Sequence, residues 1–324
     1  MRILVIGGTQ FFGKHFVEAA LARGDDVTVF SRGQTRPPFW NRITHIGADR
    51  KNHAAFAAAV RSRTFDVVID NIAFTRKDVE TAVAAFSGRI GHYILTSSGS
   101  VYPDFEPPEI YRAIPEEAAD LTIRGDLPYA EGKRECEQVL HEQPDLPFTI
   151  IRPPIVQGPD DASLRGWFWY QRVADGELVL VPDRNPHPIW RQAFSRDVAT
   201  AFLLAAGNRT AFGRTYNVAS EEILALDEFV RLVAAILEKP DPVIVVSQDV
   251  LKQEASWYAP TYVHRFVMDI SRIKTDLGFT PTPYGGWLTE TVRWHLSAGL
   301  RDSAGYERRA DEVVLARWLR DRLK

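Results

Sequence analysis

Short apolar runs alternate with longer segments that carry apolar residues on one face through the first half of the chain. The runs predict strands at residues 2–6, 27–30, 43–46, 65–69, 90–95 and 148–151. The longer segments predict helices after the first run and at 54–60, 78–86 and 129–141. Strands that alternate with helices, and that are apolar on both faces, predict a parallel sheet covered by helices on both sides.

The regular alternation ends after residue 152. Pro153, Pro154, Gly158 and Pro159 interrupt it, and only 215–218 and 243–246 still have the pattern of strands. Helices are expected at 197–206, 226–238, 286–297 and 306–323, the last amphipathic and rich in arginine. Three tryptophans of this half could either line a cleft or close a core: Trp167, Trp169 and Trp190.

The first strand runs directly into a glycine turn, Gly7-Gly8-Thr9-Gln10-Phe11-Phe12-Gly13. Such a turn between a buried strand and a helix presents backbone N–H groups and a positive helix end to a pyrophosphate. We therefore expect an α/β protein with a Rossmann-type doubly wound parallel sheet. Residues 1–152 would form the dinucleotide-binding domain. Residues 153–324 would form a smaller C-terminal substrate-binding lobe, interleaved with the end of the sheet.

Composition excludes several other classes. A net charge of −3 gives no overall attraction to nucleic acid or anionic membranes. No apolar run approaches the ~20 residues that span a bilayer, and the N-terminus lacks a signal-peptide pattern, so the cytoplasm is expected. The single cysteine, Cys136, cannot form an intrachain disulfide and is expected to be a packing residue. No metal site is expected.

Tyr129 and Lys133 are four residues apart in a predicted helix, so they lie on one face. A lysine ammonium one turn away favours the phenolate and lowers the pKa of the tyrosine. Such a pair can take a proton from a hydroxyl or give one to a carbonyl. Alone, the pair is common on exposed helices.

A cluster of hydroxyls, Ser97, Ser98 and Ser100, follows the predicted strand at 90–95. Ligands of doubly wound sheets bind outside the carboxyl ends of the strands. Hydroxyls at that edge can hydrogen-bond an oxygen whose charge changes during reaction. The alternative is an ordinary polar turn.

Together these motifs resemble the extended short-chain dehydrogenase/reductase superfamily, in its NAD-dependent epimerase/dehydratase-like branch with a Gly-Gly-Thr-x-Phe-x-Gly turn. The resemblance covers nearly the whole chain. It rests on the following segments: 6–13, 97–102, 129–133, 152–159, 196–199, 216–219 and 276–281. The same branch includes relatives of the chloroplast stem-loop RNA-binding protein.

The resemblance implies catalytic roles for three residues. Tyr129 would be the general acid/base, Lys133 would lower its pKa and hold the nicotinamide ribose, and Ser98 would align the reacting oxygen, with Ser97 and Ser100 as alternatives. It also implies a set of cofactor-binding residues: Gly7, Gly8, Thr9, Gln10, Phe11, Phe12, Gly13, Ser31, Arg32, Asp49, Arg50, Ile72, Ala73, Ser97, Tyr129, Lys133, Pro153 and Ile155.

Three departures from the family pattern carry information. The second strand ends in Ser31-Arg32 with no acidic residue for a ribose 2′-hydroxyl, so a 2′-phosphate fits better and NADP is favoured, with NAD as the alternative. Gln10 replaces the middle glycine of the turn. Ile155 stands where many sugar epimerases carry an asparagine that meets the substrate phosphate.

The sequence therefore predicts an NAD(P)-dependent enzyme that acts on a hydroxyl or keto carbon. Reduction, epimerisation and dehydration remain open. The substrate class that the resemblance implies is a nucleotide sugar or related small molecule, and the usual assembly is a homodimer. The alternative is a non-catalytic cofactor-binding or RNA-binding module on the same fold. Its basic residues would be the C-terminal arginines at 308–322, and nucleic acid is the less favoured partner.

Overall fold

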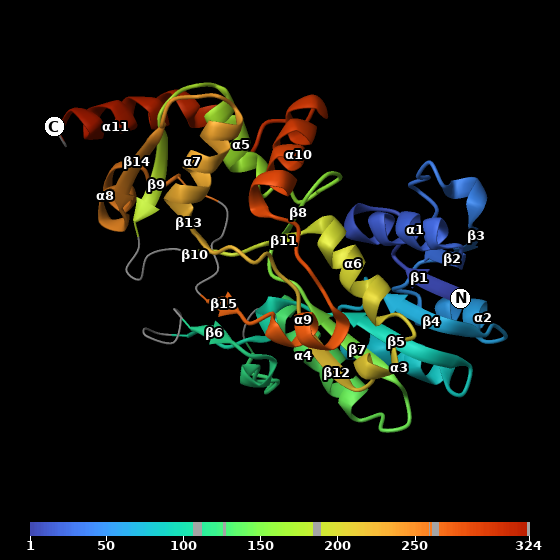
Figure 1. The fold of residues 1–324 in the computed structure, drawn as a ribbon. Coiled ribbons are helices and arrows are strands. Elements are labelled where there is room, and N and C mark those ends of the chain that lie inside the picture. Colours follow the sequence, from blue (N-terminus) through green and yellow to red (C-terminus); the bar gives the residue numbers. More distant parts are fainter. Residues whose placement is uncertain (106–111, 126–127, 184–188, 259, 261–265, 323–324) are drawn as a thin grey trace.

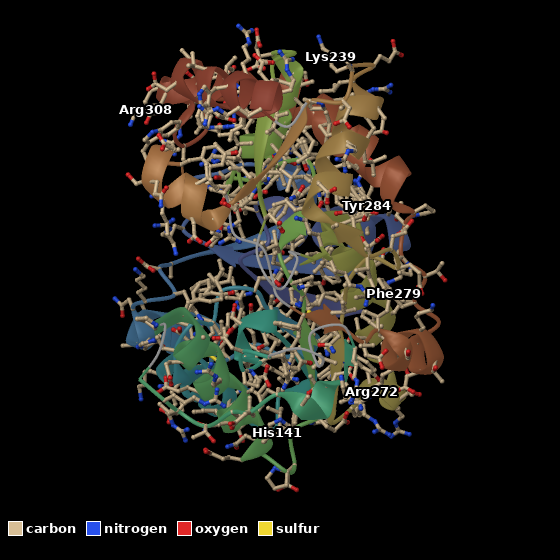
Figure 2. The ribbon with its side chains drawn as sticks, turned by 90° about the vertical axis from the view of Figure 1, so that its left-hand side faces the viewer. His141, Lys239, Arg272, Phe279, Tyr284 and Arg308 are labelled. Atoms are coloured by element: carbon tan, nitrogen blue, oxygen red, sulfur yellow. The ribbon has the colours of Figure 1, made fainter. Side chains whose placement is uncertain are left out.

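The computed structural model describes residues 1–105, 112–125, 128–183, 189–258, 260 and 266–322, with the side chains of residues 189 and 190 outside the description. The chain forms a sheet-containing half and a smaller lobe, with the N-terminus in the sheet half and the C-terminal helix on the far side of the lobe (Figure 1). Figure 2 shows the same division from the side, with Lys239 and Arg308 in the lobe and His141 and Arg272 in the sheet half.

A parallel sheet of seven strands forms the centre of the sheet half. Its order is β12-β7-β5-β4-β1-β2-β3, and every neighbouring pair is parallel. The strands are β1 (Arg2–Ile6), β2 (Asp26–Ser31), β3 (Thr44–Gly47), β4 (Phe65–Asp70), β5 (Ile90–Thr96), β7 (Phe148–Arg152) and β12 (Arg214–Asn217). The strand order reverses between β1 and β4, which is where doubly wound folds bind their ligands.

Both faces of the sheet are buried because successive strand residues point to opposite sides. Ile3 and Val5 of β1 pack in one core with the helices α1 (Phe11–Arg23), α6 (Ser195–Ala205) and α9 (Ser271–Leu277). Leu4 and Ile6 pack in the other core with α2 (His53–Val60), α3 (Arg76–Phe86) and α4 (Pro128–His141). Three helices on each face complete the doubly wound architecture.

The lobe is built from helices and short strand pairs around an aromatic core. Its helices are α5 (Trp167–Ala174), α7 (Leu226–Ile236), α8 (Gln248–Glu254), α10 (Tyr284–Ser297) and α11 (Arg309–Arg322). Its one longer pair is β9 (Val179–Asp183) with β14 (Val243–Ser247). Two-residue pairs join it to the sheet half: β8 (Val156–Gln157) with β11 (Ala193–Phe194), β10 (Ile189–Trp190) with β13 (Leu224–Ala225), and β6 (Ala113–Ile114) with β15 (Val267–Met268).

The predicted fold class is confirmed, and the differences lie in the second half. Trp167 and Trp169, left open between a cleft and a core, lie in α5 and are buried in the lobe core. The side chain of Trp190 lies outside the described residues. Strands of two residues are too short to give a period of two, so the sequence pattern could not reveal them. Among the described residues, no helix is long and apolar enough to cross a membrane.

Candidate active site

The glycine turn connects β1 to α1 at the point where the strand order reverses. Gly7 has φ = +86°, which a residue with a side chain rarely adopts, and its N–H donates to the carbonyl of Phe30 at the end of β2 (3.0 Å). The first backbone bond closing α1 runs from Lys14 N to Gln10 O (3.1 Å), so the N–H groups of Phe11 and Phe12 precede it. No acidic residue lies in the first turn of α1. The end of the helix is therefore free to attract an anion.

The glycines also bring backbone segments closer than a side chain would allow. A Cβ on Gly7 would lie 2.7 Å from the Ile72 side chain, and one on Gly13 would lie 2.6 Å from the Gly7 carbonyl oxygen. Gln10, which replaces the middle glycine, has an extended backbone (φ −140°) and needs no glycine there. Its side chain instead donates to the Thr35 hydroxyl (3.2 Å). The turn is thus a tight cradle despite the missing glycine.

Asn71 joins this cradle to the hydroxyl edge of the sheet and was not singled out in the sequence. Its backbone N–H donates to Ile6 O (3.0 Å), while its amide oxygen accepts from the Thr96 hydroxyl (2.7 Å). The residue is buried at the end of β4. A polar residue directly after a buried strand, followed by Ile72 and Ala73, was the signal that could have revealed it.

Lys133 is almost completely buried beneath the cleft. Its ammonium donates to the carbonyls of Ala73 (2.7 Å) and Thr96 (2.8 Å), which leaves its third N–H without an acceptor among the described residues. It lies 4.6 Å from the centre of the Phe74 ring and 5.8 Å from that of Tyr129. Burial lowers the pKa of Lys133. The structure thus brings the predicted Tyr129–Lys133 pair together on α4.

Tyr129 differs from the expectation in its ionisation. The residue is 49% exposed, and desolvation by the surrounding protein raises the pKa of Tyr129. Interactions with the Ser98 hydroxyl and with the charge of Arg165 oppose this shift and do not outweigh it. The Lys133 ammonium lies 5.8 Å from the centre of the Tyr129 ring, yet the pKa of Tyr129 is raised rather than lowered as predicted. The phenol is therefore protonated at neutral pH.

The three serines after β5 have separate surroundings. Ser98 faces Tyr129; its hydroxyl accepts the Ser100 N–H (3.1 Å) and contacts the Ser100 hydroxyl (3.1 Å). Ser97 is turned inward, where its hydroxyl donates to the carboxylate of Glu137. This arrangement supports Ser98 as the serine next to Tyr129, and it leaves Ser97 in contact with the interior.

Of the residues predicted near the adenosine half of the cofactor, two have exposed side chains and two bind other side chains of the protein. Arg32 is exposed, and its guanidinium has no ion-pair partner among the described residues, whereas the Ser31 hydroxyl contacts His45 Nε2 (3.0 Å). Asp49 is exposed. Arg50 is buried and points inward instead, paired with Asp70 at the end of β4 (2.9 Å). Arg50 therefore supports the strand end rather than presenting its charge to solvent.

Three more of the predicted cofactor residues make contacts through their backbones. Ala73 supplies the carbonyl that holds Lys133, and Pro153 O accepts the Gly99 N–H (2.8 Å) beside Ser98. Ile155 is buried, and its carbonyl accepts the Ala193 N–H (3.0 Å). These contacts place the segment after β7 next to the hydroxyl edge.

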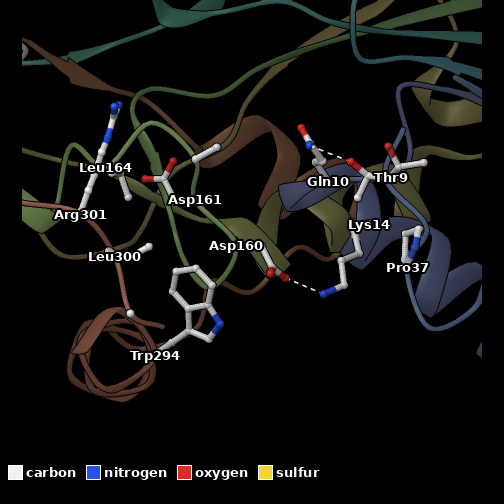
Figure 3. Close-up of a pocket in the computed structure, with 13 residues that line it drawn as sticks. Thr9, Gln10, Lys14, Pro37, Asp160, Asp161, Leu164, Trp294, Leu300 and Arg301 are labelled. Atoms are coloured by element: carbon white, nitrogen blue, oxygen red, sulfur yellow. Dashed lines mark hydrogen bonds and ion pairs between the residues drawn. The ribbon is translucent and has the colours of Figure 1, made fainter. Parts of the chain in front are cut away.

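A cavity of about 540 Å³ lies between the glycine turn and the lobe (Figure 3). Thr9, Gln10 and Lys14 line one side, and Asp160 and Trp294 are on the other. The Lys14 ammonium and the Asp160 carboxylate form an ion pair across it (2.6 Å). Its volume is within the range of small-molecule sites. Neither Tyr129 nor Ser98 lines it, so this cavity lies at the glycine turn and not at the proposed acid/base.

The remaining chemistry-bearing groups fit packing roles. Cys136 is buried, and burial raises its pKa to about 12, so its thiol is a poor nucleophile. Within the described part of the chain, no three His, Cys, Asp or Glu side chains are grouped so that they could hold a metal ion.

Comparison with known proteins identifies the family of the chain. Residues 3–219 match the profile of the NAD dependent epimerase/dehydratase family. The chain is 28% identical over 298 residues to the chloroplast stem-loop binding protein of 41 kDa b from Arabidopsis thaliana, covering 86% of this chain and 75% of that protein. It is 24% identical over 327 residues to dTDP-glucose 4,6-dehydratase from Streptomyces niveus, covering 91% and 93% of the two chains.

The fold has the same relatives. The UDP-glucose 4-epimerase of Thermus thermophilus, solved with NAD, superposes with a TM-score of 0.71 at 21% identity, over 92% of this chain and 100% of that one.

The chain belongs to the NAD dependent epimerase/dehydratase family. It is an enzyme of the extended short-chain dehydrogenase/reductase type, and the predicted resemblance is confirmed at this level.

Proposed function

We propose that the protein is an NAD(P)-dependent oxidoreductase or epimerase that acts on a hydroxyl or keto carbon of a small molecule, with Tyr129 as its general acid/base. The observation that carries this proposal is that the three predicted catalytic side chains lie close together. Tyr129, Ser98 and Lys133 come from two elements to one edge of the sheet, and Asn71 ties that edge to the glycine turn. A nucleotide sugar or related molecule is the proposed substrate class, in line with the dTDP-glucose dehydratase among the relatives.

The turn fits a dinucleotide for two reasons. Gly7 and Gly13 have no side chains, so the backbone segments of the turn pack tightly, and the first turn of α1 has no acidic residue that would repel a pyrophosphate. Residues of the turn would meet the pyrophosphate, and the third N–H of Lys133 would meet the nicotinamide ribose. The cofactor supplies the hydride acceptor or donor. Around it, this chain positions the substrate oxygen between the Tyr129 and Ser98 hydroxyls.

The raised pKa of Tyr129 gives the reaction a direction-dependent response to pH. A protonated phenol can donate its proton to a developing alkoxide during reduction. In oxidation the same group must first lose its proton, so we expect the oxidation rate to rise with pH across the neutral range. Initial rates measured in both directions between pH 6 and pH 10 test this; an oxidation rate independent of pH contradicts it.

Replacing Tyr129 by phenylalanine tests the proposed acid/base directly. We expect turnover to fall by about 10²–10⁴-fold, the usual contribution of general acid–base catalysis, while cofactor affinity stays nearly unchanged. The measurement is product formation, with net cofactor reduction followed alongside it, against a panel containing UDP-glucose, dTDP-glucose and a 3β-hydroxysteroid. Tyr306→Phe is the matched control, because that hydroxyl binds Asp175 on the lobe (2.9 Å). Full turnover by Tyr129→Phe would remove Tyr129 from the mechanism.

The preference for NADP is proposed from Arg32. An exposed guanidinium without a partner among the described residues can pair a 2′-phosphate. We expect Arg32→Ala to weaken NADP⁺ binding about tenfold or more and to leave NAD⁺ binding unchanged. Titration calorimetry with both dinucleotides measures this. Arg36→Ala is the control, since Arg36 lies over the Trp40 ring (5.7 Å). Equal affinities of the unmodified protein for the two dinucleotides would contradict the role of Arg32.

RNA binding is the second candidate, favoured by the similarity to the chloroplast stem-loop binding protein. The C-terminal arginines give it little support. Arg309 is largely buried and paired with Asp175 (2.8 Å), and Arg317 pairs with Glu177 (2.6 Å). Their charge is thus neutralised locally rather than presented as a basic stripe. Salt-dependent binding of a stem-loop RNA by a protein that turns over none of the panel would favour this candidate.

The predicted homodimer and cytoplasmic location remain predictions. Light scattering on the eluting protein tests the first, since a single species at the monomer mass of 36.6 kDa would rule out a stable dimer.

A further inference from the structure

Glu137 lies on the same face of α4 as the two residues already placed at the site. Tyr129, Lys133 and Glu137 follow one another at intervals of four, so their side chains form one row along the helix. The row runs from the cleft into the interior: Tyr129 is 49% exposed, whereas Lys133 and Glu137 are 1% and 0% exposed. The proposed mechanism assigns no task to this buried carboxylate.

Both oxygens of Glu137 are occupied by groups at the carboxyl edge of the sheet. Oε1 accepts from Arg152 Nε (2.9 Å) and from the Ser97 hydroxyl, while Oε2 accepts from Arg152 Nη2. Arg152 ends β7 and Ser97 directly follows β5, which are neighbouring strands. A single carboxylate therefore connects α4 to the ends of two strands.

The segment that Glu137 holds through Ser97 carries two groups of the site. Thr96, one residue before, supplies the carbonyl that accepts from Lys133 (2.8 Å), and Ser98, one residue after, faces Tyr129. The backbone of the segment is also fixed to the next strand by Ser97 N to Ile151 O (2.8 Å). A shift of Ser97 would therefore move the serine hydroxyl and the lysine partner together.

Arg152 completes this arrangement because its guanidinium finds all its hydrogen-bond partners inside the protein. It is 3% exposed, and its Nη1 donates to the Glu116 carbonyl (2.8 Å) and the Tyr102 hydroxyl (3.2 Å). Although burial alone would lower it, the Glu137 carboxylate raises the pKa of Arg152. Removing the charge of Glu137 leaves a buried guanidinium uncompensated, so the strand ends must rearrange.

We propose that Glu137 is a positioning residue of the active site, which sets the Ser98 hydroxyl and the Lys133 ammonium relative to Tyr129 by clamping the ends of β5 and β7. This inference rests on the proposed function. It adds a task for a residue that touches neither the proposed substrate nor the proposed cofactor. The bidentate pair with Arg152 gives the clamp its geometry, and the Ser97 hydroxyl transmits it to the site.

The test compares the two ends of the cofactor in Glu137→Gln, which keeps the shape of the side chain and removes its charge. In the proposed mode of binding, NADP⁺ would contact Lys133 through its nicotinamide half, and adenosine 2′,5′-bisphosphate, which lacks that half, would not. We expect Glu137→Gln to weaken NADP⁺ binding tenfold or more in titration calorimetry, and to leave adenosine 2′,5′-bisphosphate binding within twofold of the unmodified protein. At saturating NADPH, the enhancement of nicotinamide fluorescence should also diminish.

The matched control is Glu312→Gln in the lobe. Glu312 and Arg172 form a second fully buried carboxylate–guanidinium pair (2.9 Å) that is remote from the hydroxyl edge. Its loss should lower the thermal unfolding midpoint as Glu137→Gln does, yet leave NADP⁺ affinity and NADPH fluorescence unchanged. Equal weakening of both ligands by Glu137→Gln, or no weakening of either, would overturn the proposal.

Two further measurements cover the cases in which Glu137→Gln does not fold or the unmodified protein does not bind NADP⁺. If Glu137→Gln does not fold, Ser97→Ala removes only the hydroxyl link and should weaken NADP⁺ two- to fivefold without affecting adenosine 2′,5′-bisphosphate; unchanged NADP⁺ affinity then counts against the clamp. If the unmodified protein binds neither NADP⁺ nor NAD⁺, the proposed function itself fails. If the unmodified protein binds NAD⁺ but not NADP⁺, the same experiments use NAD⁺ in place of NADP⁺, NADH in place of NADPH, and ADP in place of adenosine 2′,5′-bisphosphate.

Discussion

The sheet half and the lobe bury different kinds of side chain. Aliphatic residues such as Ile3, Val5 and Val29 dominate the cores on the sheet, and the buried polar groups there gather at the carboxyl edge. The lobe core holds a larger share of aromatic side chains, Trp169 and Trp287 among them. Their indole N–H groups have no hydrogen-bond acceptor among the described residues.

The two regions therefore contribute differently: the sheet edge fixes the positions of polar side chains, and the lobe core mainly fills volume. At the edge of the sheet, buried polar groups are linked into chains of hydrogen bonds, such as Ser97–Glu137–Arg152, which fix positions. In the lobe core, large rings fill much of the volume beside the buried Arg172–Glu312 pair. We therefore expect changes at the edge to alter binding and chemistry, and changes in the lobe core to alter mainly stability.

The largest expected effect is on stability, from Trp169→Ala. This side chain is fully buried, and its removal leaves a cavity in the lobe core. We expect a loss of about 3–5 kcal/mol in the free energy of unfolding, measured by urea denaturation. Under conditions where the variant remains folded, its affinity for the cofactor should match that of the unmodified protein. A large loss of affinity with little loss of stability would break the division between the two regions.

The second effect is on binding, from Gly13→Ala. The new Cβ would meet the Gly7 carbonyl oxygen at 2.6 Å, and this contact is with backbone that cannot swing away. We expect a loss of about 1–3 kcal/mol in unfolding free energy from overpacking, together with at least a tenfold loss of cofactor affinity. Calorimetric titration and thermal melting measure the two.

A lobe glycine provides the control for this prediction. A Cβ on Gly285 in α10 would meet nothing within 4 Å. Gly285→Ala should therefore gain up to about 1 kcal/mol from helix propensity and leave cofactor binding unchanged. If both alanine variants behaved alike, the tight cradle at Gly13 would not be the cause.

The smallest effect is expected where the two regions meet, at the Lys14–Asp160 ion pair. Both side chains are partly exposed, so Asp160→Asn should change the free energy of unfolding by less than about 1 kcal/mol. It removes a negative charge beside the glycine turn and frees Lys14. Cofactor affinity should therefore rise a few-fold, more so at low salt. Glu290→Gln, at the exposed pair with Arg196, is the control; a loss of affinity in Asp160→Asn would contradict this account.

Much of the sheet half could be predicted because its signals are local. Buried strands are short apolar runs, and the strand at 65–69 is observed as β4 with one residue more. Tyr129 and Lys133 were found because four residues make one helical turn. Asn71 and Glu137 were missed because each acts through partners distant in sequence: Thr96 for Asn71, and Ser97 and Arg152 for Glu137.

The ionisation of the site could not be predicted from the pair alone. A lysine one turn from Tyr129 suggested a lowered pKa, but desolvation by the surrounding protein raises the pKa of Tyr129 instead. Arg50 shows the same limit, since its pairing with Asp70 depends on the segment after β3 reaching the end of β4, which is not its neighbour in the sheet. Spacing identifies candidates, whereas burial decides their charge.

The sequence by itself determined the class of fold, the glycine turn and the identity of the tyrosine and lysine on one helical face, because each of these is encoded within a few consecutive residues. Only the tertiary structure decided which serine faces Tyr129, which charges are buried and which carboxylate clamps the strand ends. Those properties depend on contacts between residues 15 to 40 positions apart in the sequence, such as Glu137 with Arg152 and Ser97 with Glu137. No local pattern specifies such contacts, because they depend on how helices and strands from different parts of the chain pack against one another in the close-packed interior.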